Sequence, residues 1–289
     1  MHTNGMQGRI GWLVTGLVTV LSCGRGSEQP LSVLVTNGQE NGFSVTSTLI
    51  SGARDAILVD AQFTLSDGAR VADWIQQSGK RLTTVFITHG HPDHYFGLAP
   101  VLAKFPDAEV IATASVIEEM KAYAPQTVAQ WKPLYGENLT DQPMFPKAFT
   151  SDHLTLEGHR IDLIALPPGE SEHATALWIP SIRTVVAGDA VFNRVHVWLA
   201  GVNAERRASW LRNLDSLKAL GPTTVVGGHR APGAVDAPAV LDSTAQYIRD
   251  FSQTVAASRR PEEVISRMTA AHGNRTLPVI LELAAKSAF

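Results

Sequence analysis

The stretch from Thr84 to His94 constrains this chain more than any other. Its apolar start favours a buried strand, because β-branched and aromatic residues bounded by glycine and proline suit a covered sheet. The strand then breaks into a loop with three histidines and an aspartate. His89 and His91 alternate and so direct their imidazoles to the same side, whereas Asp93 and His94 face a neighbouring point. Imidazole and carboxylate groups are ligands of Zn²⁺ and related ions, so the loop predicts two adjacent metal sites.

The pattern His89-x-His91-x-Asp93-His94 resembles the signature of the metallo-β-lactamase superfamily, whose members are mostly dinuclear metallohydrolases. A polar turn with solvated histidines is the other interpretation, and it accounts poorly for so many ligand-type residues at fixed spacing. The resemblance covers residues 31–233. It implies an α/β fold, a four-layer αβ/βα sandwich of two mixed β-sheets with helices outside and metals at the edge where strand ends meet.

The periodicity of the chain agrees with this fold, because strands and helices alternate and would form mixed sheets covered by helices. Residues 131–149 carry four prolines or glycines together with aromatic residues, and we expect a long irregular loop there, either a lid over an apolar substrate or a flap packed on its own core. The C-terminal residues 277–289 give no clear signal. Strands are predicted at 31–36, 43–50, 56–61, 84–88, 109–113, 154–156, 159–166, 174–179, 183–187 and 224–226, and helices at 66–77, 95–105, 204–220, 237–256 and 261–271.

Two later strand ends resemble the remaining metal-ligand motifs of the superfamily. Asp189 ends an apolar strand in Gly-Asp and resembles the carboxylate that bridges the two metals in glyoxalase II and the lactonases. His229 follows a second apolar strand and two glycines, and it resembles the last ligand, which completes the second metal site with Asp93 and His94. The other interpretation of Asp189 is an ordinary turn aspartate.

The third ligand of the first metal departs from the family pattern. A histidine normally follows a Pro-Gly or Gly-Gly turn, and aligning that turn here places Glu170 in the ligand position. His173 comes three residues later and would reach the site only if the turn were rebuilt; otherwise it is a group facing the substrate or supporting a ligand. A carboxylate suits zinc and widens the choice of metal towards Mn²⁺ or Fe²⁺.

Three further residues have candidate roles near the centre. Asp60 ends an early strand and resembles the aspartate that supports the metal-binding loop, although an ordinary strand-end aspartate would give the same pattern and Gln62 stands where the family usually has glycine. Asn193 and His196 follow the bridging aspartate closely. His196 is either a donor to the substrate carbonyl or leaving group, or a packed loop histidine.

The beginning of the chain has the pattern of a targeting segment. An apolar run at residues 10–21 has the length of a signal peptide and is short for a membrane span. Residues 20–24 resemble a bacterial lipoprotein processing site with Cys23 as the lipidated residue, and a plain signal peptide or a misassigned start are the alternatives. We therefore expect residues 1–23 to be a signal peptide and export to the periplasm or cell envelope, with the membrane contacted only through this anchor.

Composition bounds the rest of the chain. Residues 24–30 are expected to form a tether and 31–289 the hydrolase domain. Cys23 is the only cysteine, so no internal disulfide and no cysteine metal ligand are available. A net charge of −3 gives no basic field for a polyanion, so a nucleic-acid partner is not expected and a small-molecule acyl substrate is.

The resemblance implies a dinuclear hydrolase with two divalent metal ions, in which a metal-bound hydroxide oriented by Asp93 attacks a carbonyl. An exported lactone, ester or thioester hydrolase is the first expectation, with lactones and esters preferred because the substrate of glyoxalase II is cytosolic. A metallo-β-lactamase acting on β-lactams is the second, although true β-lactamases generally lack the bridging aspartate. A non-catalytic exported metal-binding protein is the third, and Glu170 is its main support.

Overall fold

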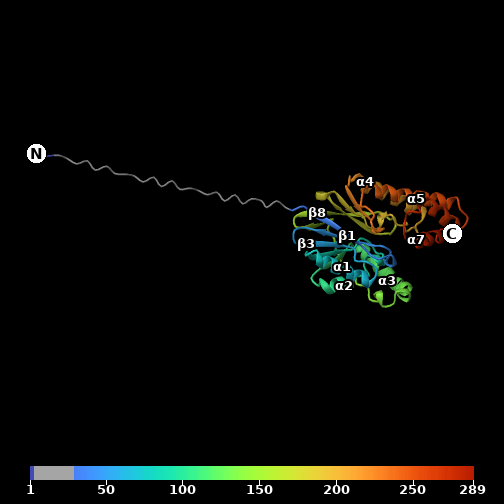
Figure 1. Cartoon of the computed structure of the whole chain (residues 1–289), viewed down its shortest axis with the longest axis horizontal. Helices are drawn as coiled ribbons and strands as arrows, with labels where there is room; N and C mark the ends of the chain where they lie inside the picture. The colour runs from blue at the N-terminus through green and yellow to red at the C-terminus, as the bar shows by residue number, and fades with distance from the viewer. Residues whose placement is uncertain (3–28) are drawn as a thin grey trace.

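The computed structural model describes residues 1–2 and 29–289, and Figure 1 shows their arrangement. Two β-sheets lie face to face between an outer layer containing α1, α2 and α3 and an opposite layer containing α4 and α5 (Figure 1). The expected four-layer α/β sandwich is therefore confirmed. The expected leader, lipidation residue Cys23 and most of the tether lie outside the described residues. Among residues 29–289, no helix combines the length and apolar character needed to cross a membrane.

The first sheet is mixed and has six strands in sequential order. Its first three strands pair antiparallel, and the later pairs from β3 to β6 are parallel. The loops after β3 and β4 therefore open at the same edge of the sheet. The strands are β1 (Ser32–Asn37), β2 (Thr46–Ser51), β3 (Asp55–Val59), β4 (Arg81–Phe86), β5 (Glu109–Ala112) and β6 (Lys147–Ala148).

The second sheet has five strands in the order β12-β10-β9-β8-β7. Only the pair β10 and β12 is parallel, so the loops that follow these two strands also share one edge. A short parallel pair, β11 and β13, continues beyond that edge. The strands are β7 (His153–Leu156), β8 (His159–Leu166), β9 (Ala174–Ile179), β10 (Thr184–Val186), β11 (Phe192–Asn193), β12 (Thr224–Val226) and β13 (His229–Arg230).

The helices follow the apolar periodicity of the sequence, with side-chain caps at two of their starts. Thr64 accepts from the Asp67 backbone at the start of α1, and Asn203 accepts from the Arg206 backbone at the start of α4. The helices are α1 (Leu65–Gln77), α2 (Leu98–Lys104), α3 (Ala114–Tyr135), α4 (Ala204–Ala219), α5 (Ala239–Ala256), α6 (Pro261–His272) and α7 (Pro278–Lys286), and short 3-10 turns occupy Glu40–Gly42, Pro92–His94, Gly136–Asn138, Pro180–Ile182 and Gly188–Ala190.

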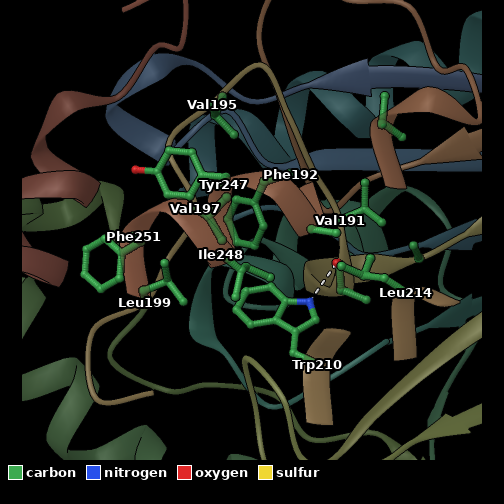
Figure 2. Packing of buried hydrophobic residues seen from close by; sticks show 14 of the residues in the cluster. Val191, Phe192, Val195, Val197, Leu199, Trp210, Leu214, Tyr247, Ile248 and Phe251 are labelled. Atoms are coloured by element: carbon green, nitrogen blue, oxygen red, sulfur yellow. Dashed lines mark hydrogen bonds between the residues drawn. The ribbon is translucent and has the colours of Figure 1, made fainter. Parts of the chain in front are cut away.

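Three apolar clusters hold these layers together. The middle cluster packs the two sheets against each other, with Phe86 from the first sheet and Leu177 from the second both fully buried. The largest cluster lies between the second sheet and its helices, and Figure 2 shows Trp210 of α4 packed near Phe192 and Ile248. The Trp210 indole N–H donates to the Ala190 carbonyl at 2.8 Å (Figure 2). A buried indole thus fixes the turn that carries Asp189.

Residues 131–149 are not one long irregular loop, so that prediction was wrong. Helix α3 continues to Tyr135 with Pro125 and Pro133 inside it, a 3-10 turn follows, and β6 takes up the end of the segment. Both prolines are exposed, and apolar contacts of Val128 and Trp131 with the core hold the last turns of the helix. Tertiary packing here outweighs the helix-breaking tendency of proline.

Two smaller predictions also need correction. The strand expected from residue 43 begins at Thr46, because Phe43 and Ser44 both have positive φ angles and form a turn instead. The helix expected from residue 95 begins at Leu98, because a tight turn at Pro92–His94 precedes it. The C-terminal segment that gave no sequence signal contains α7, whose buried Ile280 and Leu281 pack on the large cluster.

Candidate metal centre

Four loops meet at the shared edge of the two sheets, and each follows the end of a strand. They come after β4, β8, β10 and β12, and they carry the predicted ligands His89 to His94, Glu170, Asp189 and His229. Backbone contacts join the loops across the sheets: the Thr175 N–H donates to the Thr88 carbonyl at 2.9 Å, and the Thr46 N–H to the Gly228 carbonyl at 2.8 Å. The edge is therefore built jointly by both halves of the chain.

A first group of ligand-type atoms comes from His89, His91, Glu170 and Asp189, all within 4.8 Å of one another. The shortest separation, 3.0 Å, lies between His91 Nδ1 and Glu170 Oε1. His89 Nε2 lies 4.0 Å from Glu170 Oε2 and 3.6 Å from Asp189 Oδ2. Glu170 thus occupies the position that the sequence alignment of the turn predicts.

A second group comes from Asp93, His94 and His229. His229 Nε2 lies 3.4 Å from Asp93 Oδ2, and His94 Nε2 lies 3.9 Å from the same oxygen. Asp189 lies between the two groups, because Oδ2 is 3.6 Å from His89 Nε2 of the first group and Oδ1 is 3.1 Å from His94 Nε2 of the second. This is the position that a carboxylate shared by two cations requires.

Several of these atoms are buried and have no hydrogen-bond partner among residues 1–2 and 29–289. They are His89 Nε2, His94 Nε2, Asp189 Oδ1 and both carboxylate oxygens of Glu170. Leaving buried polar atoms unpaired is costly, and five that converge on one place call for a bound cation. Nitrogen and oxygen donors of this mixture fit Zn²⁺, with Mn²⁺ and Fe²⁺ as alternatives that accept the carboxylate-rich set.

The other ring nitrogen of each buried histidine has a fixed acceptor. His94 Nδ1 donates to Asp60 Oδ2 at 2.8 Å, and His229 Nδ1 donates to the Phe43 carbonyl at 2.7 Å. His89 Nδ1 lies 2.9 Å from the Thr88 hydroxyl. With Nδ1 occupied by a proton, the Nε2 lone pair of each ring is available to a metal ion.

Asp60 supports the metal-binding loop from below. Besides His94, its carboxylate accepts from the Thr88 hydroxyl at 2.8 Å and from the Thr88 backbone at 2.9 Å. Gln62, where glycine was expected, has a φ of 74° in the left-handed region. Its amide donates to the Ser47 hydroxyl at 2.7 Å and the Val45 carbonyl at 3.1 Å, which compensates for the strained backbone.

The turn that carries Glu170 is held by one face of α4. Arg206 donates from Nε to the Gly169 carbonyl at 2.9 Å and from its terminal nitrogen to the Glu170 carbonyl at 2.6 Å. Two helical turns further on, Asn213 donates to the Pro167 carbonyl at 2.7 Å. The Trp210 side chain between them fills the space that a Cβ at Gly169 would need, with a nearest approach of 3.2 Å.

Burial and neighbouring charges set the ionisation of the cluster. Burial holds the pKa of His89 well below its usual value, so this ring stays neutral. Burial also opposes protonation of His91, yet the adjacent Glu170 carboxylate raises its pKa to about 9. Burial opposes ionisation of Asp189, but His229, His94 and His89 hold its pKa well below the usual range.

A cavity of about 570 Å³ opens over both groups. Asp93, Glu170, Asp189 and His229 form part of its floor. Its walls lie mainly on one face of α3 and in the loop before α4, and include Trp131 from the segment that was expected to be a lid or a flap. The wall residues are Tyr123, Gln126, Thr127, Gln130, Trp131, Trp198, Ala200 and Gly201, together with Phe43, Phe63 and Ile280. Their spacing on α3 fits one helical face, and this periodicity is the signal that could have found them in the sequence.

Three candidate residues lie elsewhere. His173 is exposed and belongs to neither group of ligand atoms. The Asn193 amide donates to the Val235 carbonyl at 3.0 Å, and buried His196 contacts the Tyr247 hydroxyl through Nδ1 at 2.8 Å. Asn193 and His196 do not line the cavity, so the structure places neither as a substrate-facing group.

A model of the metallo-beta-lactamase superfamily matches residues 41–229, which includes every predicted ligand. This chain belongs to the metallo-β-lactamase superfamily. The hydroxyacylglutathione hydrolase of Actinobacillus pleuropneumoniae serotype 5b (strain L20) is 28% identical over 139 residues, which make up 48% of this chain and 46% of that protein. The chain thus spans about half the length of the curated relatives that it matches.

Solved structures of this superfamily share the fold across most of the chain. A metallo-β-lactamase family protein from Thermus thermophilus has a TM-score of 0.62 at 20% identity, covering 90% of this chain and 91% of its own. A metallo-β-lactamase from Pontibacter korlensis has a TM-score of 0.56 at 15% identity, covering 76% of this chain and 95% of its own. Identities this low show a common fold and leave the substrate to be inferred from the site.

Proposed function

We propose that this protein is a dinuclear metal-dependent hydrolase that cleaves an ester, lactone or thioester. The observation that carries the proposal is the Asp189 carboxylate, whose Oδ2 lies 3.6 Å from His89 Nε2 of the first group and whose Oδ1 lies 3.1 Å from His94 Nε2 of the second. It joins two groups of ligand atoms, several of which are buried without partners. The match to hydroxyacylglutathione hydrolases, which act on an acylated thiol, supports an acyl substrate of this kind.

The first metal would be held by His89, His91 and Glu170, and the second by Asp93, His94 and His229. Asp189 would help to hold both. Two divalent cations at these positions would act as Lewis acids towards the substrate carbonyl and lower the pKa of water. Asp93 lines the cavity, and its Oδ2 faces His94 and His229. Its other oxygen is left to orient the attacking water and to accept its proton.

The test is hydrolysis by the full chain of a panel of lactones, aryl esters, thioesters and a chromogenic cephalosporin, before and after chelation and with Zn²⁺ or Mn²⁺ returned. We expect turnover of at least one acyl substrate that is lost with chelator and restored by metal. Preferential turnover of the cephalosporin would favour the β-lactamase alternative. A folded sample that retains two metals but hydrolyses no substrate would favour a metal-binding protein without catalysis.

We propose further that the chain is exported and anchored through a lipid on Cys23. Support comes from the sequence alone, in the apolar run and the Val20-Leu21-Ser22-Cys23 pattern. Labelling of the expressed chain with radioactive palmitate should give a membrane-bound, labelled product. The Cys23→Ala variant should lose the label, and label that persists in this variant would contradict the proposal.

A further inference from the structure

The walls of the cavity over the candidate metal centre carry neutral side chains. Phe43, Phe63 and Trp131 form an aromatic wall, with ring centroids 5.5 to 6.0 Å apart. Trp198 and Ile280 lie in the wall contributed by the second half of the chain. Neutral hydrogen-bonding groups are also present, in the hydroxyls of Tyr123 and Thr127 and the amides of Gln126 and Gln130. Apolar contact and uncharged hydrogen bonds are therefore what the walls offer a ligand.

Within the described residues, no lysine or arginine lines the cavity. The basic residues next to lining residues in the sequence are committed elsewhere. Lys132, beside Trp131, donates to the Leu139 carbonyl at 2.8 Å. Arg230, beside His229, binds Asn37 and pairs with Asp236. With His91 and His229 engaged as the proposed metal ligands, a carboxylate on a ligand would find no other basic side chain of the described residues to bind in this cavity.

The floor of the cavity does not supply that missing charge. Glu170 stands where the family pattern has a neutral histidine, so three carboxylates face the metal positions, namely those of Asp93, Glu170 and Asp189. They would balance three of the four positive charges that two divalent cations would bring, which would leave one net positive charge at the metal positions beside the reacting carbonyl. A carboxylate far from the reacting carbonyl of the substrate would thus meet a nearly neutral floor and uncharged walls. It would lose its hydration on binding and would form no ion pair in return.

From these observations we propose that the cavity selects uncharged acyl substrates: esters, lactones or thioesters whose acyl part is an apolar chain or ring without a carboxylate. The inference rests on the hydrolase function proposed above and narrows its substrate class. It excludes as good substrates β-lactams and acylated glutathione, because both carry carboxylates beside the reacting carbonyl or on the leaving group. Aromatic contacts would bind the acyl part, and the α3 amides would bind neutral polar groups.

A matched pair of substrates tests the inference. The zinc-loaded full chain is given the mono-p-nitrophenyl ester of adipic acid, which ends in a carboxylate, and the same ester with that carboxylate methylated. We expect kcat/KM for the methylated, neutral ester to be higher by about tenfold or more, since one unpaired charge must be desolvated. Equal efficiency, or preference for the carboxylate, would overturn the inference while the hydrolysis itself would uphold the proposed function.

A charge placed in the cavity wall should reverse the preference. Gln130→Lys, or Gln126→Lys as an independent variant, should raise the ratio of kcat/KM for the anionic ester to kcat/KM for the neutral ester about tenfold. Ala129→Lys is the matched control, because Ala129 is exposed on the same helix and does not line the cavity. A similar gain in the Ala129→Lys variant would show a general surface-charge effect and overturn the assignment to the cavity.

Binding without turnover separates the two proposals. Anilides of the same two acyl chains resist hydrolysis, and quenching of the fluorescence of Trp131 and Trp198 in the cavity wall reports their binding. We expect a dissociation constant at least about tenfold lower for the neutral anilide, even if the protein hydrolyses neither ester. Absence of turnover would count against the hydrolase function alone. Equal binding of the two anilides would overturn the selection of uncharged ligands.

Discussion

The loop after β4 and the turn after β8 both bring residues to the candidate metal centre, yet they are held in different ways. The loop is held through its ligand side chains and the adjoining Thr88, because the Asp60 carboxylate contacts His94 and Thr88 directly. The turn is held through its backbone, because Arg206 and Asn213 bind the carbonyl groups of residues 167, 169 and 170. Among the described residues, none forms a hydrogen bond of good geometry to the Glu170 carboxylate, whose nearest neighbour is the candidate ligand His91 at 3.0 Å.

The difference indicates how one ligand residue can be replaced by another in the sequence without a change in the backbone of the site. A histidine oriented by a carboxylate depends on that carboxylate for its tautomer and its angle. When the turn is instead held by hydrogen bonds to its carbonyl groups, the position of its ligand depends only on the path of the main chain. The turn can therefore carry a glutamate in place of a histidine. Three substitutions test this contrast, and a fourth tests a histidine that lies outside both segments.

The largest effect should come from Glu170→Ala. Removal of this carboxylate takes a ligand from the first group, so zinc should fall from about two ions to about one per chain, with kcat/KM reduced by about a hundredfold or more. Plasma emission spectroscopy after gel filtration measures the metal. The control is His173→Ala, which should keep both ions. Metal loss in the His173→Ala variant alone would assign the ligand to His173 instead.

Asp60→Ala should come next. It removes the acceptor of His94 and the anchor of Thr88 together, and we expect zinc affinity to fall by about 10- to 100-fold. Competition with a chromogenic chelator gives the affinity. Asp60→Asn keeps an acceptor oxygen and should lie between the alanine variant and the natural chain. An unchanged affinity in Asp60→Ala would mean that packing alone orients the loop.

Arg206→Met should have a smaller effect on metal affinity, about tenfold or less, because Asn213 and Trp210 still hold the turn. The same competition measurement applies. Arg212→Met is its control, since Arg212 lies exposed on the same helix. If both variants bind zinc like the natural chain, the hydrogen bonds from Arg206 to the turn would not be needed for metal binding. The contrast between the loop and the turn would then fail.

His196→Gln should leave metal binding unchanged and alter only the pH dependence of stability. Burial lowers the pKa of His196 to about 4, from 6.5 in an unfolded chain. The folded state therefore resists protonation, and the contribution of His196 is present above pH 6.5 and is lost as the pH falls towards 4, on the order of 3 kcal/mol in all. Urea unfolding at pH 7, 5.5 and 4.5 should show a shallower loss for the variant. Parallel curves would contradict a buried neutral histidine.

The sequence predicts the fold well and brings the candidate ligands to one edge of the sheets, because both depend on local patterns. Apolar strands that end in His-x-His-x-Asp-His, in Gly-Asp and in Gly-Gly-His signal buried strands with polar ends, and the fold expected from them is confirmed. Even the Glu170 turn could be placed by counting residues from Pro167 to Pro180. The ligand roles themselves stay predictions until metal is measured.

The hydrogen bonds that hold the ligand-bearing segments, and the cavity itself, could not be predicted, because they arise from contacts between distant parts of the chain. Arg206 lies 36 residues from the Glu170 carbonyl that it binds, and nothing in its own neighbourhood marks it. The cavity face of α3 was missed in part because Pro133 and the glycine and prolines after it indicated a loop from residue 131, where tertiary contacts keep a helix to Tyr135. Asn193 and His196 looked functional because they follow Asp189 closely, yet the chain turns their side chains into hydrogen bonds elsewhere.

Each group of ligand atoms draws on both halves of the chain: His89, His91, Asp93 and His94 precede the exposed segment 141–145, and Glu170, Asp189 and His229 follow it. A cation bound to either group is thus a cross-link between two pieces that a single cut could create. If the chain were nicked in that segment, the fragments should stay associated through the shared core, more tightly with metal than without it. The metal centre would then hold the two fragments together reversibly, in addition to being the site of the reaction.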